Sequence, residues 1–130
     1  MNTLIPFAQQ MLAKNGEFYP FGASMGKEGE LTHVGASTGS EHPASQELIK
    51  LLIAGFQRDA AEGNLRAAGI CIDVRIVLPG AIEKSDAICV QLEHVNGEAI
   101  EIYVPYRKGW LGKIKYGELF ASKGKSAFFA

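Results

Sequence analysis

The stretch AICVQLEHVNGEAIEIYVPY, residues 87–106, contains two runs of alternating apolar and polar side chains on either side of an Asn-Gly pair. This alternation is typical of half-buried β-strands. A two-residue loop would place Leu92 opposite Glu101, whereas a three-residue loop, residues 95–97, places Leu92 opposite Ile100. A shift of one residue would turn a whole apolar row to solvent. We therefore expect a hairpin with the three-residue loop, closed by a glycine in the left-handed conformation.

Residues 66–78 form the second clear strand, because apolar residues from Ala68 to Leu78 alternate with a second row from Gly69 to Val77. The remaining segments were assigned from helical spacing, capping residues and turn signals. They predict helices at residues 3–14, capped by Thr3, and from Pro43 to about residue 62. They further predict strands at residues 18–25 and 31–36, a short helix at 116–121, and a docked apolar segment at 126–130.

The predicted architecture is a single α+β domain, residues 1–130, in the order α-β-β-α-β-β-β with a possible short C-terminal helix. Short connections favour neighbouring strands in one sheet. We expect a five-stranded antiparallel sheet in the order 2-1-5-4-3, which leaves the third strand at an edge. This arrangement resembles the profilin-like folds, particularly the roadblock and longin domains.

Three short sequences carry a second resemblance: FYPFG at residues 18–22, DAICVQLEH at 86–94 and VPY at 104–106. They are similar to a group of small bacterial proteins of unassigned function. The resemblance implies a bacterial cytoplasmic protein and assigns no catalytic residue.

Composition excludes several classes of partner. The chain has 130 residues, 47% of them hydrophobic, and a formal net charge of −1, so we expect no nucleic acid and no membrane as partner. We find no secretory signal and no apolar run long enough to span a bilayer. With two cysteines, a cytoplasmic location is the expectation. The lysines near the C-terminus are interpreted as a solvated end: Lys115, Lys123 and Lys125.

No motif predicts a cofactor or a metal. Gly124-Lys125-Ser126 lacks the earlier glycine of a phosphate loop, because Leu119 occupies that position. The three histidines, His33, His42 and His94, have no metal-ligand spacing. We interpret His42 as part of a helix entry and His94 as a partner of Glu98 across the hairpin.

Cys71 and Cys89 both lie on the less apolar rows of their strands, which we expect to share one face. Three alternatives remain open for them: small buried apolar residues, a redox pair or disulfide, and a catalytic thiol.

The same mixed face is the best candidate for a binding site. It is predicted to present Asp73, Arg75, Gln91, Glu93, Glu101 and Tyr103. These residues are compatible with solvated cross-strand pairs. They are also compatible with acid–base chemistry by Glu93 and Glu101, with Arg75 and Tyr103 orienting a substrate.

The leading functional hypothesis is a non-enzymatic interaction or regulatory module that self-associates or binds another protein. The predicted edge position of the third strand would allow pairing of two copies into a homodimer. The alternative is a small-ligand-binding protein or minor enzyme that uses the mixed face around Glu93, Glu101 and Tyr103.

Overall fold

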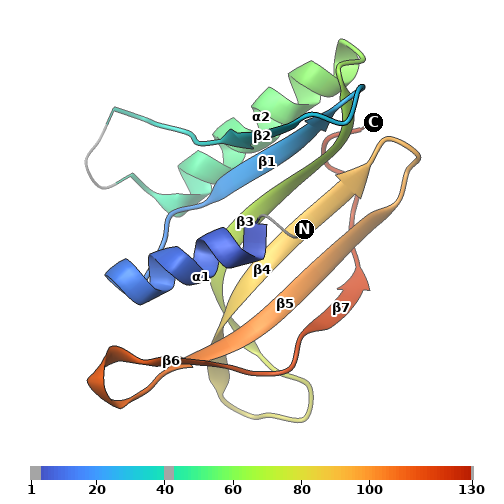
Figure 1. Cartoon of the computed structure of the whole chain (residues 1–130). Helices are drawn as coiled ribbons and strands as arrows, with labels where there is room; N and C mark the ends of the chain where they lie inside the picture. Colours follow the sequence, from blue (N-terminus) through green and yellow to red (C-terminus); the bar gives the residue numbers. More distant parts are fainter. Residues whose placement is uncertain (1–3, 40–42, 130) are drawn as a thin grey trace.

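The computed structural model describes residues 4–39 and 43–129, in which two α-helices pack on a curled antiparallel sheet (Figure 1). The predicted α+β class is confirmed, but the sheet has seven strands instead of five. In chain order the elements are α1 (Leu4–Asn15), β1 (Phe21–Gly26), β2 (Leu31–Val34), α2 (Ser45–Ala61), β3 (Leu65–Val77), β4 (Lys84–His94), β5 (Ala99–Lys108), the 3-10 turn η1 (Trp110–Gly112), β6 (Ile114–Tyr116) and β7 (Phe120–Lys123). Thr3 and His42 lie outside the described residues.

The β4–β5 hairpin has the register that the sequence predicts. Leu92 is opposite Ile100, as the three-residue loop requires. His94 and Glu98 face each other at its end, where the His94 N–H donates to the Glu98 carbonyl at 2.8 Å. Gly97 closes the loop with φ 99°. The alternation of side chains was therefore sufficient to fix this register.

The predicted strand order is wrong. The sheet runs β2-β1-β3-β4-β5-β6, so β3 lies at its centre and pairs with both β1 and β4. Ile70 and Cys71, which point to opposite faces of β3, are both 0% exposed. A strand that is apolar on both faces needs cover on both faces and neighbours on both edges, which only a central position provides. The order 2-1-5-4-3, and the dimer edge expected from it, are therefore absent.

Each helix covers one face of the sheet. On the α1 face, Leu4, Ala8 and Leu12 pack on residues that include Cys71, Ile88, Val90, Ile102 and Val104. On the α2 face, Leu52 and Phe56 pack on Ala68, Ile70 and Ile72. The close approach of β1 to this helix requires glycine, because a Cβ at Gly22 would lie 2.8 Å from the Phe56 ring.

The C-terminal part differs from the prediction at one point. Instead of a helix at residues 116–121, the chain adds β6 and β7 along β5. The free edge of β5 explains this, because unpaired backbone groups there gain ladder hydrogen bonds that an isolated short helix could not replace. The predicted docking of the last apolar segment is confirmed: Phe128 is 4% exposed and meets the ring of Phe56 edge-on at 5.2 Å.

Candidate interaction surface

The six residues of the predicted mixed face do not share one face. Residues opposite each other in a ladder project on the same side of a sheet. Asp73 is opposite Ile88, so Asp73 and Arg75 project on the α1 face. The other four residues project on the α2 face: Gln91, Glu93, Glu101 and Tyr103. Arg75 therefore lies on the opposite face from Glu93 and Glu101 and cannot orient a substrate beside them as predicted.

Glu93 holds the C-terminal segment in place. Its carboxylate is buried, with 4% of the residue exposed. It accepts hydrogen bonds from the Ser126 hydroxyl (2.6 Å) and from the backbone N–H groups of Ala127 (2.7 Å), Phe128 (2.9 Å) and Phe129 (2.9 Å). Burial alone would raise the pKa of Glu93, but these four donors outweigh it and hold the pKa below its ordinary value. The carboxylate is thus engaged in a structural role.

Glu101 and Tyr103 are engaged with each other. The Tyr103 hydroxyl donates to a Glu101 carboxylate oxygen at 2.7 Å, and its ring stacks on Phe120 at 5.1 Å. Burial and the hydrogen bond to Glu101 raise the pKa of Tyr103. A hollow of about 190 Å³ lies beside Glu93 and Glu101. It is too small for a drug-sized ligand, for which pockets of about 300 Å³ or more are usual.

Asp73 and Arg75 form two separate contacts on the other face. The Tyr106 hydroxyl donates to Asp73 at 2.5 Å, while Arg75 and Asp86 form an exposed ion pair at 3.7 Å. Burial raises the pKa of Asp73 despite the hydrogen bond from Tyr106. Burial and the hydrogen bond to Asp73 also raise the pKa of Tyr106. The first contact joins β3 to β5 across β4, and the second joins the neighbouring strands β3 and β4.

The two cysteines lie on opposite faces, contrary to the expectation from the sequence. Cys71 is opposite Val90 and Cys89 is opposite Ile72, so the sheet itself separates the two thiols. Both are buried and free. Burial raises the pKa of Cys89 to about 11 and that of Cys71 further. Since the thiolate is the reactive form, their surroundings agree with the first alternative, small buried apolar residues.

The histidines are also accounted for where they are described. His33 meets the Phe7 ring at 5.5 Å, and the Nδ1 of His94 accepts a hydrogen bond from the Asn96 N–H at 3.1 Å. Within residues 4–39 and 43–129, no three His, Cys, Asp or Glu side chains are grouped to hold a metal ion.

A surface that the sequence analysis did not single out lies at one end of the sheet. The β3–β4 loop and the β5–β6 loop leave the same end of the sheet, because Val77 is opposite Lys84, Asp86 is opposite Tyr106 and Lys108 is opposite Ile114, and they extend from it in different directions (Figure 1). Three large apolar side chains project from these two loops. They are Ile82 (95% exposed), Trp110 (87%) and Leu111 (81%), the most exposed large apolar residues in the described chain. We call this region the basic end and define it by residues 75–86 and 106–118.

The conformation of the β5–β6 loop presents its apolar pair outward. Leu111 has φ 63°, and it is the only residue other than glycine with a positive φ in the described chain. Gly112 continues in the same region, with φ 77°. The left-handed conformation costs a branched residue roughly 1–2 kcal/mol, and such strain is concentrated at functional sites. No apolar packing compensates for it at Leu111, since this side chain is in solvent.

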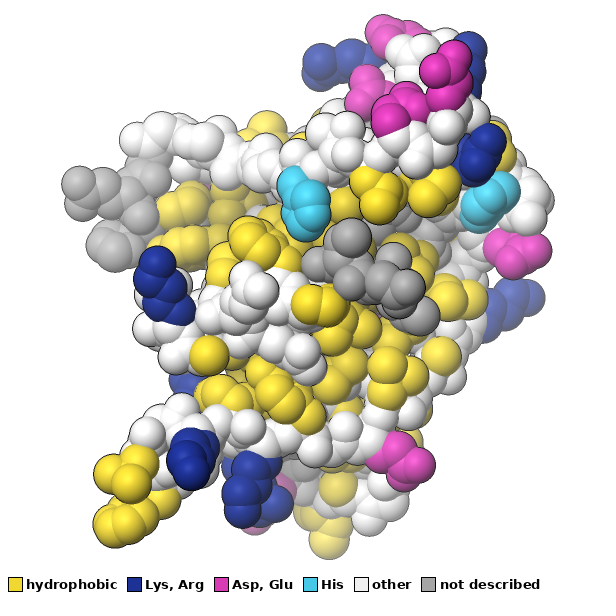
Figure 2. All heavy atoms as spheres, viewed as in Figure 1, with side chains coloured by type: hydrophobic (Ala, Val, Ile, Leu, Met, Phe, Trp, Pro, Cys, Tyr) yellow, Lys and Arg dark blue, Asp and Glu magenta, His cyan; other side chains and the backbone are white. Residues whose placement is uncertain are grey.

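Positive charge surrounds the apolar tips. The basic end contains six basic and three acidic side chains, so it has an excess of three positive charges, and the rest of the chain has an excess of four negative ones. Figure 2 shows Lys and Arg side chains beside the apolar tip of the projecting hairpin, and a group of acidic side chains with Lys and Arg among them at the opposite end. Arg107 is directly opposite Lys115, an arrangement of like charges that destabilises a sheet. Among the described residues, no carboxylate pairs with Arg107, Lys113 or Lys115.

The two loops border a common hollow of about 500 Å³. It is lined from the β3–β4 side by Arg75 and Lys84, and from the β5–β6 side by Arg107 and Lys115. The acidic residues in its wall are Glu83 and Asp86, and Asp86 is paired with Arg75. The hollow therefore has the charge and the openness to receive a small anionic group.

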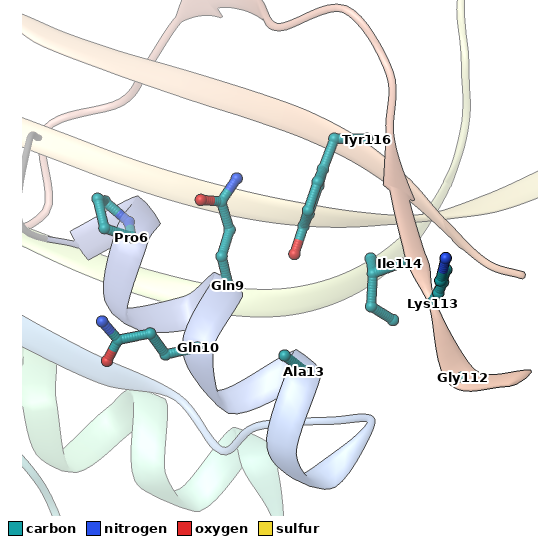
Figure 3. A pocket seen from close by; sticks show the side chains of 8 residues that line it. All are labelled: Pro6, Gln9, Gln10, Ala13, Gly112, Lys113, Ile114 and Tyr116. Carbon is teal, nitrogen blue, oxygen red and sulfur yellow. The ribbon is translucent and has the colours of Figure 1, made fainter.

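A second, larger hollow of about 710 Å³ lies between α1 and β6, next to the same hairpin (Figure 3). The Gln9 amide and the Tyr116 hydroxyl point into the space between the two elements, while Gln10 points away. Among the described residues that line it, Lys113 is the only charged one, and they include no acid–base pair. This groove makes the hairpin stand apart from the rest of the molecule.

The sequence contained a signal for the basic end. Residues 107–115 read RKGWLGKIK, in which Trp110 and Leu111 are bracketed by four basic residues. A charge sum over the whole chain hides this cluster, because negative charges elsewhere cancel it.

No family model, curated protein or solved structure matches this chain. In residues 4–39 and 43–129, neither helix has the length and apolarity needed to cross a bilayer.

Proposed function

We propose that this protein is a non-enzymatic interaction module and that the basic end is its contact surface. The observation that supports it most is that the three most exposed large apolar side chains of the described residues all lie at one cationic end of the sheet. Large apolar side chains in water mark contact sites when they gather in one place. Trp and Arg, both present here, are the residue types that contribute most to such contacts.

The polar groups first considered for chemistry do not favour an enzyme. The carboxylate of Glu93 is saturated by four donors, and that of Glu101 accepts from Tyr103. Neither thiol has a lowered pKa. A general base needs a free site within reach of a substrate, and a nucleophile needs activation.

Self-association remains a prediction, but its predicted surface changes. Because β3 is central, the edges of the sheet are β2 on one side and β6 with β7 on the other. A homodimer formed by strand pairing would have to use one of these short edges.

The test uses a photo-crosslinking amino acid placed at residue 110, in cells that produce the full-length protein. We expect irradiation to give a discrete crosslinked product. The matched control places the same group at Val95, which is 54% exposed at the opposite end of the sheet. Mass spectrometry then tells whether the product contains a protein, a second copy of this chain, or a lipid.

The proposal predicts a crosslinked product from residue 110 and none from residue 95. The product from residue 110 should be lost in the K113Q/K115Q variant. The same products at both positions, or none at residue 110, would contradict it. Light scattering of the purified protein separates a second copy from other partners, because a homodimer doubles the mass.

A further inference from the structure

We propose that the basic end binds the surface of a membrane containing anionic phospholipids, with Trp110, Leu111 and Ile82 inserted at the level of the headgroups. This inference rests on the proposed function and names the partner of the same surface. It departs from the expectation based on net charge, because the overall value of −1 hides an excess of three positive charges at this end.

The apolar tips have the chemistry of membrane-interface residues. Trp is enriched at the boundary between lipid and water, where its ring lies among the headgroups and its N–H stays hydrated. Leu111 follows Trp110 at the tip of the hairpin, and both side chains are more than four-fifths exposed. Ile82 provides a second point of insertion from the neighbouring loop. These tips are small, so insertion alone would give weak and reversible binding.

The cations supply the second attraction that weak insertion needs. Basic residues near an anionic leaflet each strengthen binding about fivefold. Arg107, Lys113 and Lys115 lie immediately behind the apolar tip and have no carboxylate partner in the described chain. The hollow of about 500 Å³ between the two loops, lined by Arg75 and Lys84 as well as by Arg107, can receive a phosphate headgroup.

The shape of the basic end favours a bilayer over other anionic partners. Its apolar side chains project from two separate loops, so they fit a deformable layer better than a single pocket of a folded protein. A single-stranded nucleic acid would need several exposed rings for stacking on successive bases, whereas Trp110 is the one aromatic side chain among the three tips. An acidic protein is the remaining alternative partner. It would crosslink to residue 110 without any binding of the protein to anionic vesicles.

The experiment measures binding of the full-length protein to vesicles of phosphatidylcholine alone and of two parts phosphatidylcholine to one part phosphatidylglycerol. Trp110 is the only tryptophan in the chain, so its fluorescence reports directly on the tip. We expect the emission to shift to the blue with the anionic vesicles and not with the neutral ones. Raising the salt concentration should reduce binding, since the attraction between exposed charges is screened.

Two pairs of variants test the residues. K113Q/K115Q is expected to lose about 25-fold in affinity, measured by co-sedimentation with anionic vesicles. The matched control K123Q/K125Q removes the same charge from exposed lysines outside the basic end and is expected to keep the affinity of the original protein. W110S/L111S is expected to lose at least about tenfold, whereas V95S is expected to lose none. Circular dichroism and urea unfolding verify that every variant is folded.

Three outcomes would overturn the inference: no binding to anionic vesicles, equal binding to neutral vesicles, or equal losses in the variants and their controls. If vesicles fail to bind while residue 110 crosslinks specifically to a protein, the membrane inference is wrong and the proposed function stands. If residue 110 gives no specific crosslink and vesicles do not bind, both are wrong.

Discussion

The two ends of β5 lead into hairpin loops that differ in almost every physical respect. At one end, the β4–β5 loop is saturated: the Val95 N–H donates to the Arg66 carbonyl, Asn96 exchanges hydrogen bonds with Glu98, and Gly97 occupies the left-handed position. At the other end, the β5–β6 loop places a leucine in that conformation and an exposed tryptophan beside it.

Glu93 extends this contrast to the surrounding structure. Beside the β4–β5 loop, its carboxylate binds the C-terminal segment to the sheet. Around the β5–β6 loop, Arg107 and Lys115 lie opposite each other, and no carboxylate in the described part of the chain pairs with either. In natural proteins, local backbone preference, packing and hydrogen bonding usually favour the same structure, and exceptions are concentrated at functional sites. The difference teaches that the two ends are built for different purposes, stability and contact.

The largest expected effect on stability is at the saturated end. Glu93→Gln replaces a carboxylate by an amide whose NH₂ group cannot accept the backbone N–H bonds, so buried donors lose their acceptor. We expect the free energy of unfolding to fall by about 3 kcal/mol, measured by urea unfolding. The matched control is Lys113→Gln at the basic end, which we expect to change stability by less than about 0.5 kcal/mol. Equal effects of the two substitutions would remove the proposed contrast.

The pH dependence of stability sharpens the same point. The pKa of Glu93 is lower in the folded protein than in the unfolded chain, so its contribution is fully present above the unfolded value, about 4.3, and is lost as the pH falls through the folded value. We expect Glu93→Gln to be destabilised relative to the original protein at neutral pH and less so in acid.

Asp73 has the opposite sign. Its folded pKa is raised, so its contribution is present at low pH and is lost as the pH rises through the folded value. Asp73→Asn therefore serves as a control in urea unfolding at several pH values. A difference between Glu93→Gln and the original protein that did not shrink in acid would contradict the assignment.

A pair of exchanges tests the two loops directly. Gly97→Ala places a Cβ at φ 99° and is expected to destabilise the protein by about 1 kcal/mol or more. Leu111→Gly relieves the strain at φ 63° and removes a side chain that has little packing, so we expect no loss and a gain of up to about 1 kcal/mol. Thermal unfolding measures both. If both substitutions destabilised the protein equally, the β5–β6 loop would contribute to stability as the β4–β5 loop does, and the proposed contrast would be wrong.

The smallest effect is expected for Arg107→Glu. It turns the like-charge pair with Lys115 into an attractive one and should stabilise the hairpin by about 0.5 kcal/mol at low salt. The same substitution should weaken binding to anionic vesicles. A variant that gained stability and kept full vesicle binding would show that the exposed cations are not retained for contact.

The sequence predicted more of the fold than of the site. The register of β4–β5 and the docking of Phe128 both followed from patterns that lie within short stretches. The six candidate site residues were assigned to one face by treating each strand separately. The register between β3 and β4, which the sequence did not supply, places Asp73 opposite Ile88. Asp73 and Arg75 therefore lie on the opposite face of the sheet from the other four candidate residues.

By itself, the sequence determined the two helices, the strands from β1 to β5 and which side chains alternate, because these depend on neighbours along the chain. It did not determine β6 and β7, which form against the free edge of β5. Only the tertiary structure decided that β3 is central, that Cys71 and Cys89 lie on opposite faces, and that Glu93 binds the C-terminal segment. Burial on both faces and the pairing of free strand edges involve residues far apart in the chain. The same holds for the basic end, whose charge becomes concentrated only when two loops distant in sequence leave the same end of the sheet.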